Sequence, residues 1–480
     1  MPTMTDLAAV APEIILTLTA GLLLLVEAFA PGLRRSASLI TVIAALVAAW
    51  SRLAFALPGE VWGGMLSIDR VAAYVDLYIL VALVLTAAMA GPYLRRNDCE
   101  RGEFYTLLLL ATVGAMVMAS SVDALSLFLG LELLSIPLYV LNAYLRKTAV
   151  SVEAGLKYFV VGAFASAFVV YGIALLYGVT GTTNLVAMGR SVVAADAVSP
   201  LLAVGLAMVV GALGFKLALV PFHAWAPDVY QGSPTPVTAF LSVVPKGAAL
   251  VALLRLVDGM DLLHVSPNWV VVASVIAVAS MTLGNVVAIV QRDVKRMLAY
   301  SGIAHMGYAM VAVIVAGREG GSAVLVYLAA YTLMNIGAFA TLALMSEREN
   351  EPTLMSDLAG QGWIRPVAAA ALTLCLVSLA GVPPLFGFTG KFVVFRAAVN
   401  NGFVWLAVVG VINSLISAFY YLRVVYMMYM QPLPRREPVF QPSWLITGVA
   451  TIAAVGVLIL GIYPVPILDA AHEAILDLVR

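Results

Sequence analysis

Few residues in this chain could bind a metal ion or a redox centre. The 480 residues include only 2 cysteines and 4 histidines. Cys99 and Cys375 lie far apart, one in an expected loop and one in an apolar run, so they predict neither a disulfide nor a metal site. An iron–sulfur cluster needs four such ligands, and the sequence has no glycine-rich dinucleotide motif or P-loop. We therefore expect no cofactor and no metal in this chain itself.

Charged residues are also scarce. They make up 11% of the chain, against 63% hydrophobic residues, which leaves too little polar surface to cover a soluble globule. A membrane span needs about 20 apolar residues, and about fourteen continuous runs are long enough: 9–30, 37–57, 72–94, 104–120, 122–145, 153–178, 200–225, 236–256, 266–291, 297–316, 321–345, 366–398, 402–430 and 443–463. The sequence predicts an all-α polytopic membrane protein rather than a barrel of short alternating strands.

Neither sign of charge is in excess, since 26 basic residues balance 26 acidic ones, and we expect no nucleic-acid partner. Fourteen of the 26 basic residues lie in the connections after spans 1, 3, 5, 9, 11 and 13, and seven lie on the opposite side. Because cytoplasmic loops carry the excess of Lys and Arg, both termini are expected outside the cytoplasm, in a bacterial inner membrane. No basic residue precedes the first run, which indicates a retained helix rather than a signal peptide.

Five ionisable side chains are expected deep inside these apolar runs, away from their ends: Glu132, Lys157, Lys216, Lys246 and Lys391. Such a group costs about 2.5–3.5 kcal/mol at the centre of a membrane helix, so it usually has a partner, a water path and a function. A row of four lysines and a glutamate over five spans indicates protonatable sites. A purely structural salt bridge is the alternative for each lysine, most of all for Lys157, which lies four residues after Glu153 and could reach the surface.

The seventh and twelfth spans carry helix-breaking residues. Pro221 follows Lys216 by five residues, and Pro383 and Pro384 precede Lys391. Interrupted helices mark binding or conduction sites in transporters. Their spacing predicts two five-helix repeats, spans 4–8 and 9–13, the second inverted because five is odd. We expect one transmembrane domain over 1–480: spans 1–3 in 1–100, repeats in 104–256 and 266–430, span 14 in 443–463 and a short tail in 464–480.

Three segments resemble a known family, the antiporter-like subunits of respiratory complex I, the proton-pumping NADH:quinone oxidoreductase. They are 291–308 (QRDVKRMLAYSGIAHMGY), 130–137 (GLELLSIP) and 221–228 (PFHAWAPD). Within this family the start APEIIL at 11–16 is similar to that of the subunit N type. The short C-terminal tail and Lys391, where the M type usually has a glutamate, agree with that type.

The resemblance implies a proton path along the middle of the membrane. Glu132 and Lys216 would form a coupled pair, Lys246 a central connecting lysine and Lys391 the terminal lysine. Lys157 would modulate the pair, and His223 and His305 would extend the hydrated path with secondary roles. Our hypothesis is that Lys216 alternates between a charged state paired with Glu132 and a neutral state.

The resemblance also implies partners. They would be the other membrane subunits of complex I, M-type and small K- and J-type, together with lipids. NAD, FMN, iron–sulfur clusters and quinone would be bound by other subunits. Two alternatives remain open from the sequence: a subunit of a multi-subunit Na+/H+ antiporter, and a scaffold that conducts nothing.

Overall fold

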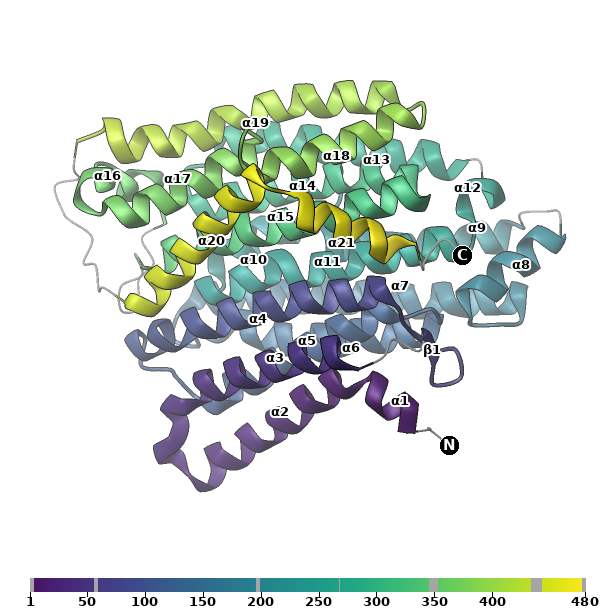
Figure 1. Cartoon of the computed structure of the whole chain (residues 1–480), viewed down its shortest axis with the longest axis horizontal. Helices are drawn as coiled ribbons and strands as arrows, with labels where there is room; N and C mark the ends of the chain where they lie inside the picture. Colours follow the sequence, from purple (N-terminus) through teal and green to yellow (C-terminus); the bar gives the residue numbers. More distant parts are fainter. Residues whose placement is uncertain are drawn as a thin grey trace.

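The computed structural model of the chain describes residues 4–55, 59–195, 199–266, 268–344, 353–432 and 443–476. Long helices run side by side through the molecule, and their ends gather at two opposite faces (Figure 1). Thirteen of the described helical segments are long and apolar enough to cross a membrane. The expected span 366–398 is divided into two helices of 15 residues each, which together make the fourteenth crossing. The all-α polytopic prediction is confirmed.

The described helices, in chain order, are α1 (Met4–Ala9), α2 (Ala11–Phe29), η1 (Pro31–Ser36), α3 (Ala37–Ala54), α4 (Arg70–Arg96), α5 (Gly102–Ser120), α6 (Ala124–Asn142), α7 (Ala149–Thr180), α8 (Leu185–Ala195), α9 (Pro200–Leu217), α10 (Trp225–Gly232), α11 (Thr235–Gly259), α12 (Leu262–Val265), α13 (Asn268–Val290), α14 (Val294–Val315), α15 (Gly317–Leu344), η2 (Met355–Leu358), α16 (Gln361–Ile364), α17 (Pro366–Ala380), α18 (Phe386–Asn400), α19 (Val404–Met430), α20 (Trp444–Ile462) and α21 (Val465–Ile475). Strands β1 (Gly59–Val61) and β2 (Leu66–Ile68) form a short antiparallel hairpin, with Val61 opposite Leu66.

The seventh crossing is interrupted after α9. Ala218 ends the helix in a left-handed conformation with a φ of 56°, and Val220 precedes Pro221 through a cis peptide bond. A proline lacks a backbone N–H, and lipid offers no partner for freed backbone groups. The protein supplies one here, because the N–H of Val220 donates to the hydroxyl of Ser280 on α13 at 2.9 Å. The polypeptide then continues into α10, so the crossing is made of two helical pieces.

The twelfth crossing is interrupted in the same way between α17 and α18. Gly381 ends α17 with a φ of 89°, a conformation that glycine adopts without steric cost. Pro383 and Pro384, joined by a cis peptide bond, follow it. The N–H of Gly387 in the first turn of α18 donates to the hydroxyl of Ser378 on α17 at 2.9 Å. Both predicted breaks are therefore present, one in each half of the chain.

The two halves repeat a loop contact as well as a break. Asp123 caps the first turn of α6, and Asp293 caps the first turn of α14. Each aspartate also accepts a hydrogen bond from a threonine hydroxyl, Thr183 after α7 and Thr353 after α15. Helices α5–α11 and α13–α19 are thus two equivalent sets of five crossings. Because five is odd, the second set enters the membrane from the opposite side.

The centre of the bundle consists of α11, α14 and α15, which are buried over nearly their whole length. In contrast, α2, α7 and α20 leave much of their surface uncovered by this chain. At one edge α2 and α3 pack against α4 and α5, and α21 packs on α15 and α4 (Figure 1). Lys246 on α11 and Lys295 on α14 are therefore enclosed by protein on every side.

Both termini lie at the same face of the bundle as the β1–β2 hairpin (Figure 1). An even number of crossings requires this arrangement. The expected tail 464–480 is represented by α21 as far as Ile475, and its last residues lie outside the described part of the chain. Four basic residues that entered the orientation count, Arg348, Arg435, Arg436 and Arg480, lie outside it too.

Candidate functional site

Lys216 lies in the last turn of α9, directly before the interruption. Its residue is 2% exposed, and its ammonium group donates a hydrogen bond to the hydroxyl of Tyr158 on α7 at 3.3 Å. The nitrogen lies 5.0–5.7 Å from the ring centres of Tyr139, Tyr158 and Phe215, and aromatic faces attract a cation. The charge also faces the negative end of the α9 dipole. Within the described residues, neutral groups alone hold this ammonium at contact distance.

Glu132 lies on α6, half-buried, and accepts a hydrogen bond from the hydroxyl of Ser166 on α7. It lines an open pocket on the outer side of α6 and α7 together with Phe128 and Tyr171. In the described structure Glu132 and Lys216 form no ion pair within 4.0 Å, although the charge of Glu132 acts on Lys216. The two members of the predicted pair are therefore apart in this structure, with the carboxylate facing the periphery of the chain, and their coupling stays a prediction.

Lys246 lies at the centre of α11, one residue after Pro245 inside the helix, and is completely buried. Its ammonium group lies 5.3 Å from the ring centre of Tyr230. Three buried polar atoms here have no hydrogen-bond partner among the described residues: the Lys246 ammonium and the hydroxyls of Tyr230 and Tyr331. All three surround Gly302 on α14, where an added Cβ would lie 2.6 Å from the Lys246 nitrogen and 2.9 Å from the Tyr331 hydroxyl. Such convergence of unsatisfied polar atoms is typical of a site for ordered water.

His305 continues this buried region on α14 and is 1% exposed. Its Nδ1 lies 2.7 Å from the hydroxyl of Tyr327, and its Nε2 lies 3.1 Å from the hydroxyl of Tyr421. Its ring centre is 5.2 Å from that of Tyr331 and 5.7 Å from that of Tyr308. A histidine with a partner at both ring nitrogens can take up a proton at one and release it at the other.

Lys391 lies in α18, just after the second interruption, and is 4% exposed. Its ammonium group donates to the carbonyl oxygens of Leu379 and Ala380 at 2.9 and 3.0 Å and to the hydroxyl of Ser414 at 2.8 Å. It also lies 5.0 Å from the ring centre of Tyr308. These carbonyls belong to the end of α17, so the break itself supplies the acceptors for the lysine.

The three lysines are joined by aromatic side chains into one buried line. Where two rings of this line are direct neighbours, their centres are 4.8–6.5 Å apart. We call this set the buried axis; its members are Lys216, Tyr158, Trp225, Tyr230, Lys246, Tyr331, His305, Tyr308 and Lys391. The axis runs from one broken crossing to the other through the most buried helices of the bundle.

Lys157 is not part of this line. Its side chain is 41% exposed and forms ion pairs with Glu153 at 2.7 Å and Asp228 at 2.6 Å. Asp228 also pairs with Arg296 at 2.6 Å. Lys157 lies within α7, which begins at Ala149 and extends to Thr180, but its side chain is on the exposed surface of this chain and not in the buried axis. Its expected depth in the span stays a prediction. Its predicted modulating role stays a prediction, and its charge partners are these acids rather than Glu132.

His223 lies in the interrupted segment between α9 and α10 and is half-buried. Its Nδ1 has no hydrogen-bond partner among the described residues. No hydrogen bond in the part of the chain that the structure describes joins it to Lys216 or Lys246. Its predicted secondary role also stays a prediction.

The sequence interpretation missed a fourth buried lysine. Lys295 was assigned to a loop as an orientation signal, yet it lies in the first turn of α14 and is completely buried. Its ammonium group donates to the carbonyl oxygen of Ser233, between α10 and α11, at 2.6 Å. The sequence signal that could have shown this is the N-cap residue Asp293, because it makes the helix begin before Lys295 rather than after it. The tyrosines of the axis were also missed, because tyrosine in an apolar span is unremarkable by composition.

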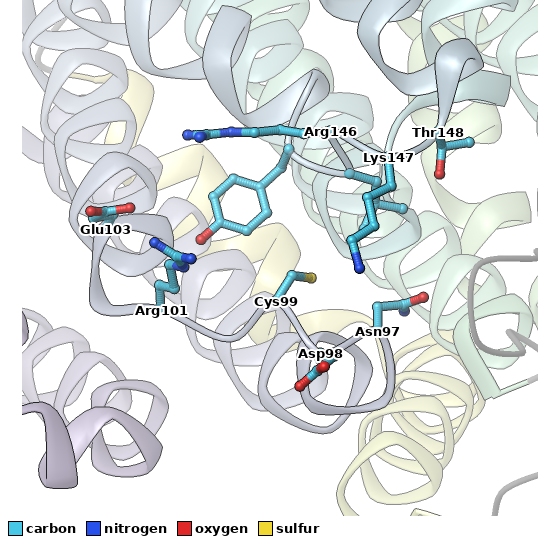
Figure 2. A pocket seen from close by; sticks show the side chains of 10 residues that line it. Asn97, Asp98, Cys99, Arg101, Glu103, Arg146, Lys147 and Thr148 are labelled. Atoms are coloured by element: carbon cyan, nitrogen blue, oxygen red, sulfur yellow. The ribbon is translucent and has the colours of Figure 1, made fainter.

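A surface pocket lies on the loops that join α4 to α5 and α6 to α7, away from the buried axis. Figure 2 shows Arg101, Arg146 and Lys147 around it, together with Cys99 and Glu103. No member of the axis lines it. Among the described residues no group of three or more His, Cys, Asp or Glu side chains could hold a metal ion. The axis itself carries ammonium, imidazole and phenol groups, which can bind and release protons.

Residues 121–417 match the family described as NADH:quinone oxidoreductase/Mrp antiporter, transmembrane. The chain is 44% identical to NADH-quinone oxidoreductase subunit N 2 of Roseiflexus castenholzii, over 95% of this chain and 94% of the relative. It is 42% identical to NADH-quinone oxidoreductase subunit N of Rhodospirillum rubrum, over 87% and 86%.

Solved structures give a similar result. A chain of respiratory complex I from Thermus thermophilus with bound aureothin is 33% identical with a TM-score of 0.83, over 96% of this chain and 99% of that one. A chain of the Mrp complex from a Dietzia strain has a TM-score of 0.84 at 23% identity, over 100% and 98%. The latter likeness shows the fold alone.

Proposed function

The chain belongs to the NADH:quinone oxidoreductase/Mrp antiporter family, as a member of the subunit N type, and we propose that its buried axis is the path of the protons. It is a membrane-arm subunit of the proton-translocating NADH:quinone oxidoreductase, complex I. In our proposal Lys216, Lys246 and Lys391 carry protons, and Glu132 regulates Lys216. His305 connects the last two lysines.

The observation that carries this proposal is the unpartnered ammonium group of Lys246 in the middle of the axis. A lysine that served only to hold helices together would have a carboxylate or carbonyl partner, since a lone buried charge is costly. Lys246 instead shares a small space with two unpartnered tyrosine hydroxyls around Gly302. Water in that space would complete a hydrogen-bonded path between Lys216 and His305.

The electrostatic energy between Glu132 and Lys216 is large enough to drive a proton along the axis. Moving one charge against 100 mV costs about 2.3 kcal/mol. Bringing a carboxylate within about 4 Å of an ammonium changes its energy by about 4 kcal/mol at an effective dielectric constant of 20. Because Glu132 now stands apart from Lys216 on the peripheral side, a shift of the carboxylate toward the lysine would favour the charged lysine. Its withdrawal would release the proton.

The position of Glu132 at the periphery of the chain supports an assignment of its neighbouring subunits. Glu132 lies on the outer side of α6 and α7, so a neighbouring subunit can reach it. We assign this neighbour to the small K- and J-type membrane subunits and a further one to the M type. NAD, FMN, iron–sulfur clusters and quinone would be bound by other subunits, and quinone reduction there would drive Glu132. Lipids would cover the remaining apolar faces.

For the orientation we propose that both termini face away from the cytoplasm of a bacterial cell. Two basic residues that the sequence count placed on the outer side, Arg52 and Arg255, are in fact buried in ion pairs. They are therefore not loop charges. Without them, the excess of basic loop residues on the opposite face becomes larger. The basic loops around the pocket that Figure 2 shows would then lie in the cytoplasm.

The test is proton pumping in membrane vesicles that carry Lys216→Ala, measured with a potential-sensitive dye alongside NADH-driven quinone reduction. Lys147→Ala, at an exposed lysine on a loop, is the matched control. A native gel establishes that each complex assembles. We expect pumping and quinone reduction to fall together in Lys216→Ala and to remain in the control. Wild-type values for both activities in an assembled Lys216→Ala complex would overturn the proposal and favour a scaffold.

The same assay distinguishes our proposal from the alternative that the chain is a subunit of a Na+/H+ antiporter. Pumping that depended on sodium rather than on NADH would contradict our proposal.

A further inference from the structure

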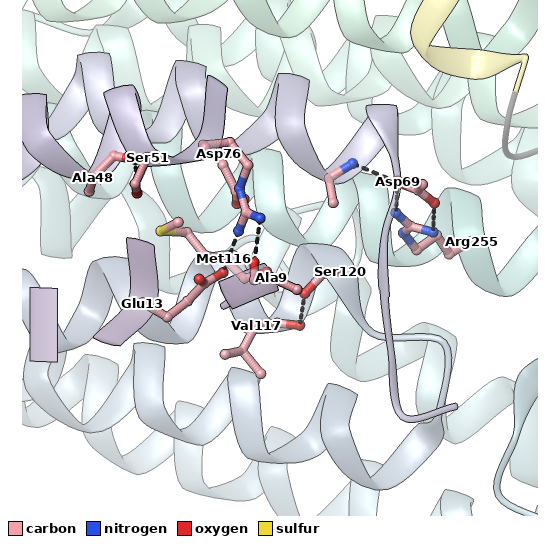
Figure 3. Close-up of polar contacts among 12 residues, drawn as sticks. Ala9, Glu13, Ala48, Ser51, Asp69, Asp76, Met116, Val117, Ser120 and Arg255 are labelled. Carbon is pink, nitrogen blue, oxygen red and sulfur yellow. Dashed lines mark hydrogen bonds and ion pairs between the residues drawn. The ribbon is translucent and has the colours of Figure 1, made fainter. Parts of the chain in front are cut away.

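A second set of buried charges lies outside the buried axis, where the first three crossings pack together. Arg52 on α3 forms ion pairs with both Glu13 on α2 and Asp76 on α4, and Figure 3 labels these two acids. Its Nη2 donates to the Oε1 of Glu13 at 2.9 Å, and its Nε lies 2.8 Å from the Oδ2 of Asp76. Its Nη1 donates to the carbonyl oxygen of Ala9 at 2.7 Å. We call Glu13, Arg52 and Asp76 the charged triad.

The charges of the triad do not balance. Two carboxyl groups face one guanidinium, and the three residues are 8%, 4% and 1% exposed. Oε2 of Glu13 and both carboxyl oxygens of Asp76 are buried without a hydrogen-bond partner among the described residues, although Oδ2 of Asp76 keeps its ion-pair contact with Arg52. If both carboxyl groups were ionised, the cluster would carry one uncompensated negative charge inside the membrane.

Among the described residues, Arg52 is the only cation that acts on Glu13 and Asp76. Asp69, just before α4, adds a further negative charge that acts on Asp76, and Arg255 is already committed to Asp69 through hydrogen bonds of 2.7 and 2.9 Å. Figure 3 shows this second pair beside the triad. The other titratable side chain of α4 that acts here is the phenol of Tyr78, which cannot provide a positive charge.

An uncompensated buried charge is costly, and two carboxylates that share one site do not both ionise. One bound proton neutralises the excess negative charge, and it does so by bonding to a carboxyl oxygen that otherwise has no partner. We propose that the charged triad binds one proton, shared between Glu13 and Asp76, as a proton site separate from the buried axis. This inference does not rest on the proposed function, since it concerns the protonation state of residues that the axis does not contain.

The proton has a structural consequence. Arg52 connects three helices, because it contacts Ala9 and Glu13 at the start of α2 and Asp76 on α4. With the proton bound, the triad is neutral and holds α2 and α3 against α4. Without it, the two carboxylates repel each other, so the attachment of the first two crossings weakens as the pH rises.

Infrared spectroscopy of the purified native complex tests this proposal, because a protonated carboxyl group has a carbonyl stretch that a carboxylate lacks. Glu13→Gln leaves one carboxylate opposite Arg52, so we expect the loss of one protonated-carboxyl band relative to wild type. Asp76→Asn should cause the same loss, because Glu13 then ionises. Glu319→Gln, at an exposed carboxylate, is the control and should leave the band unchanged.

The pH dependence of thermal unfolding gives an independent readout. The wild-type midpoint should fall as the pH is raised above neutrality, and this fall should be smaller in Glu13→Gln. An unchanged band in both triad variants, or an equal fall of the midpoint in wild type and Glu13→Gln, would overturn the proposal.

If neither triad variant assembles, wild-type complex with 13C-labelled aspartate and glutamate decides the question. A labelled protonated-carboxyl band that disappears at alkaline pH supports the shared proton, and its absence refutes it. A failure of the proposed proton path would leave these results untouched, because Lys216→Ala does not alter the triad.

Discussion

The ammonium group of Lys391 lies 3.0 Å from the carbonyl oxygen of Ala380, so a side chain of one half-helix closes the end of the other. Ala380 is the last residue of α17, and the last carbonyls of a helix have no partner within it. Pro383 and Pro384, which follow, have no N–H to offer. The lysine therefore takes the place of the missing backbone donors, and the break and the charge form a single site.

Gly381→Ala should disturb this site. The residue has a φ of 89°, and an added Cβ would lie 2.9 Å from the Cδ of Lys391. Backbone strain of this kind costs about 1–3 kcal/mol. We expect a lower thermal midpoint of the solubilised complex and reduced pumping. Gly178→Ala is the control, because its Cβ would meet nothing within 4 Å on α7; equal midpoints for the two variants would contradict the prediction.

Gly302→Ala should block the centre of the axis with little effect on the fold. The added methyl group would meet only the ends of flexible or polar side chains, the Lys246 ammonium and the Tyr331 hydroxyl. It would exclude the water that we place there. We expect an assembled complex whose NADH-driven pumping is strongly reduced, measured with a potential-sensitive dye. Gly448→Ala, in open space on α20, should pump normally, and full pumping by Gly302→Ala would show that no water is needed beside Lys246.

Asp69→Asn should destabilise the protein at neutral pH. Asp69 accepts two hydrogen bonds from Arg255, and removal of one partner of a buried pair costs about 3–5 kcal/mol. Burial by itself would raise the pKa of Asp69, but Arg255 and the neighbouring hydrogen bonds outweigh it, and the net pKa is lowered.

The pH dependence of the Asp69 pair follows from that direction. A lowered pKa means that the pair contributes above the ordinary range of an aspartate and is lost as the pH falls through the lowered pKa. The difference in thermal midpoint between wild type and Asp69→Asn should therefore be largest near neutrality and shrink in acid. Glu60→Gln, at an exposed carboxylate on β1, should behave like wild type. A difference that grew in acid would show that the pair does not hold Asp69 ionised.

Cys99 should react slowly with maleimides and from one side only. Burial raises the pKa of the Cys99 thiol to about 11, with a further contribution from Asp98, and the thiolate is the reactive form. The labelling rate should rise steadily between neutral pH and the pKa. With the proposed orientation, a membrane-impermeant maleimide should label inside-out vesicles and spare right-side-out ones, whereas Cys375 is buried and should stay unlabelled. Labelling of Cys99 from the outer face would reverse the orientation.

Much of the fold was predictable because a membrane restricts the choices. Continuous apolar runs must be helices, since lipid satisfies no backbone group, and prolines beside Lys216 and Lys391 mark where the helices must break. The depth of a residue near a helix end was less certain. Lys295 was placed in a loop although it lies buried in the first turn of α14, because hydropathy does not show where that helix begins.

The sequence by itself determined the class of protein, the two breaks and the three lysines of the axis, because each is a local property of composition or of proline and glycine chemistry. Only the tertiary structure decided which groups meet. It separated Glu132 from Lys216, joined the lysines through tyrosines and His305, and brought Glu13 and Asp76 to one guanidinium. Those contacts depend on how helices distant in sequence pack against one another, and no local pattern encodes that packing.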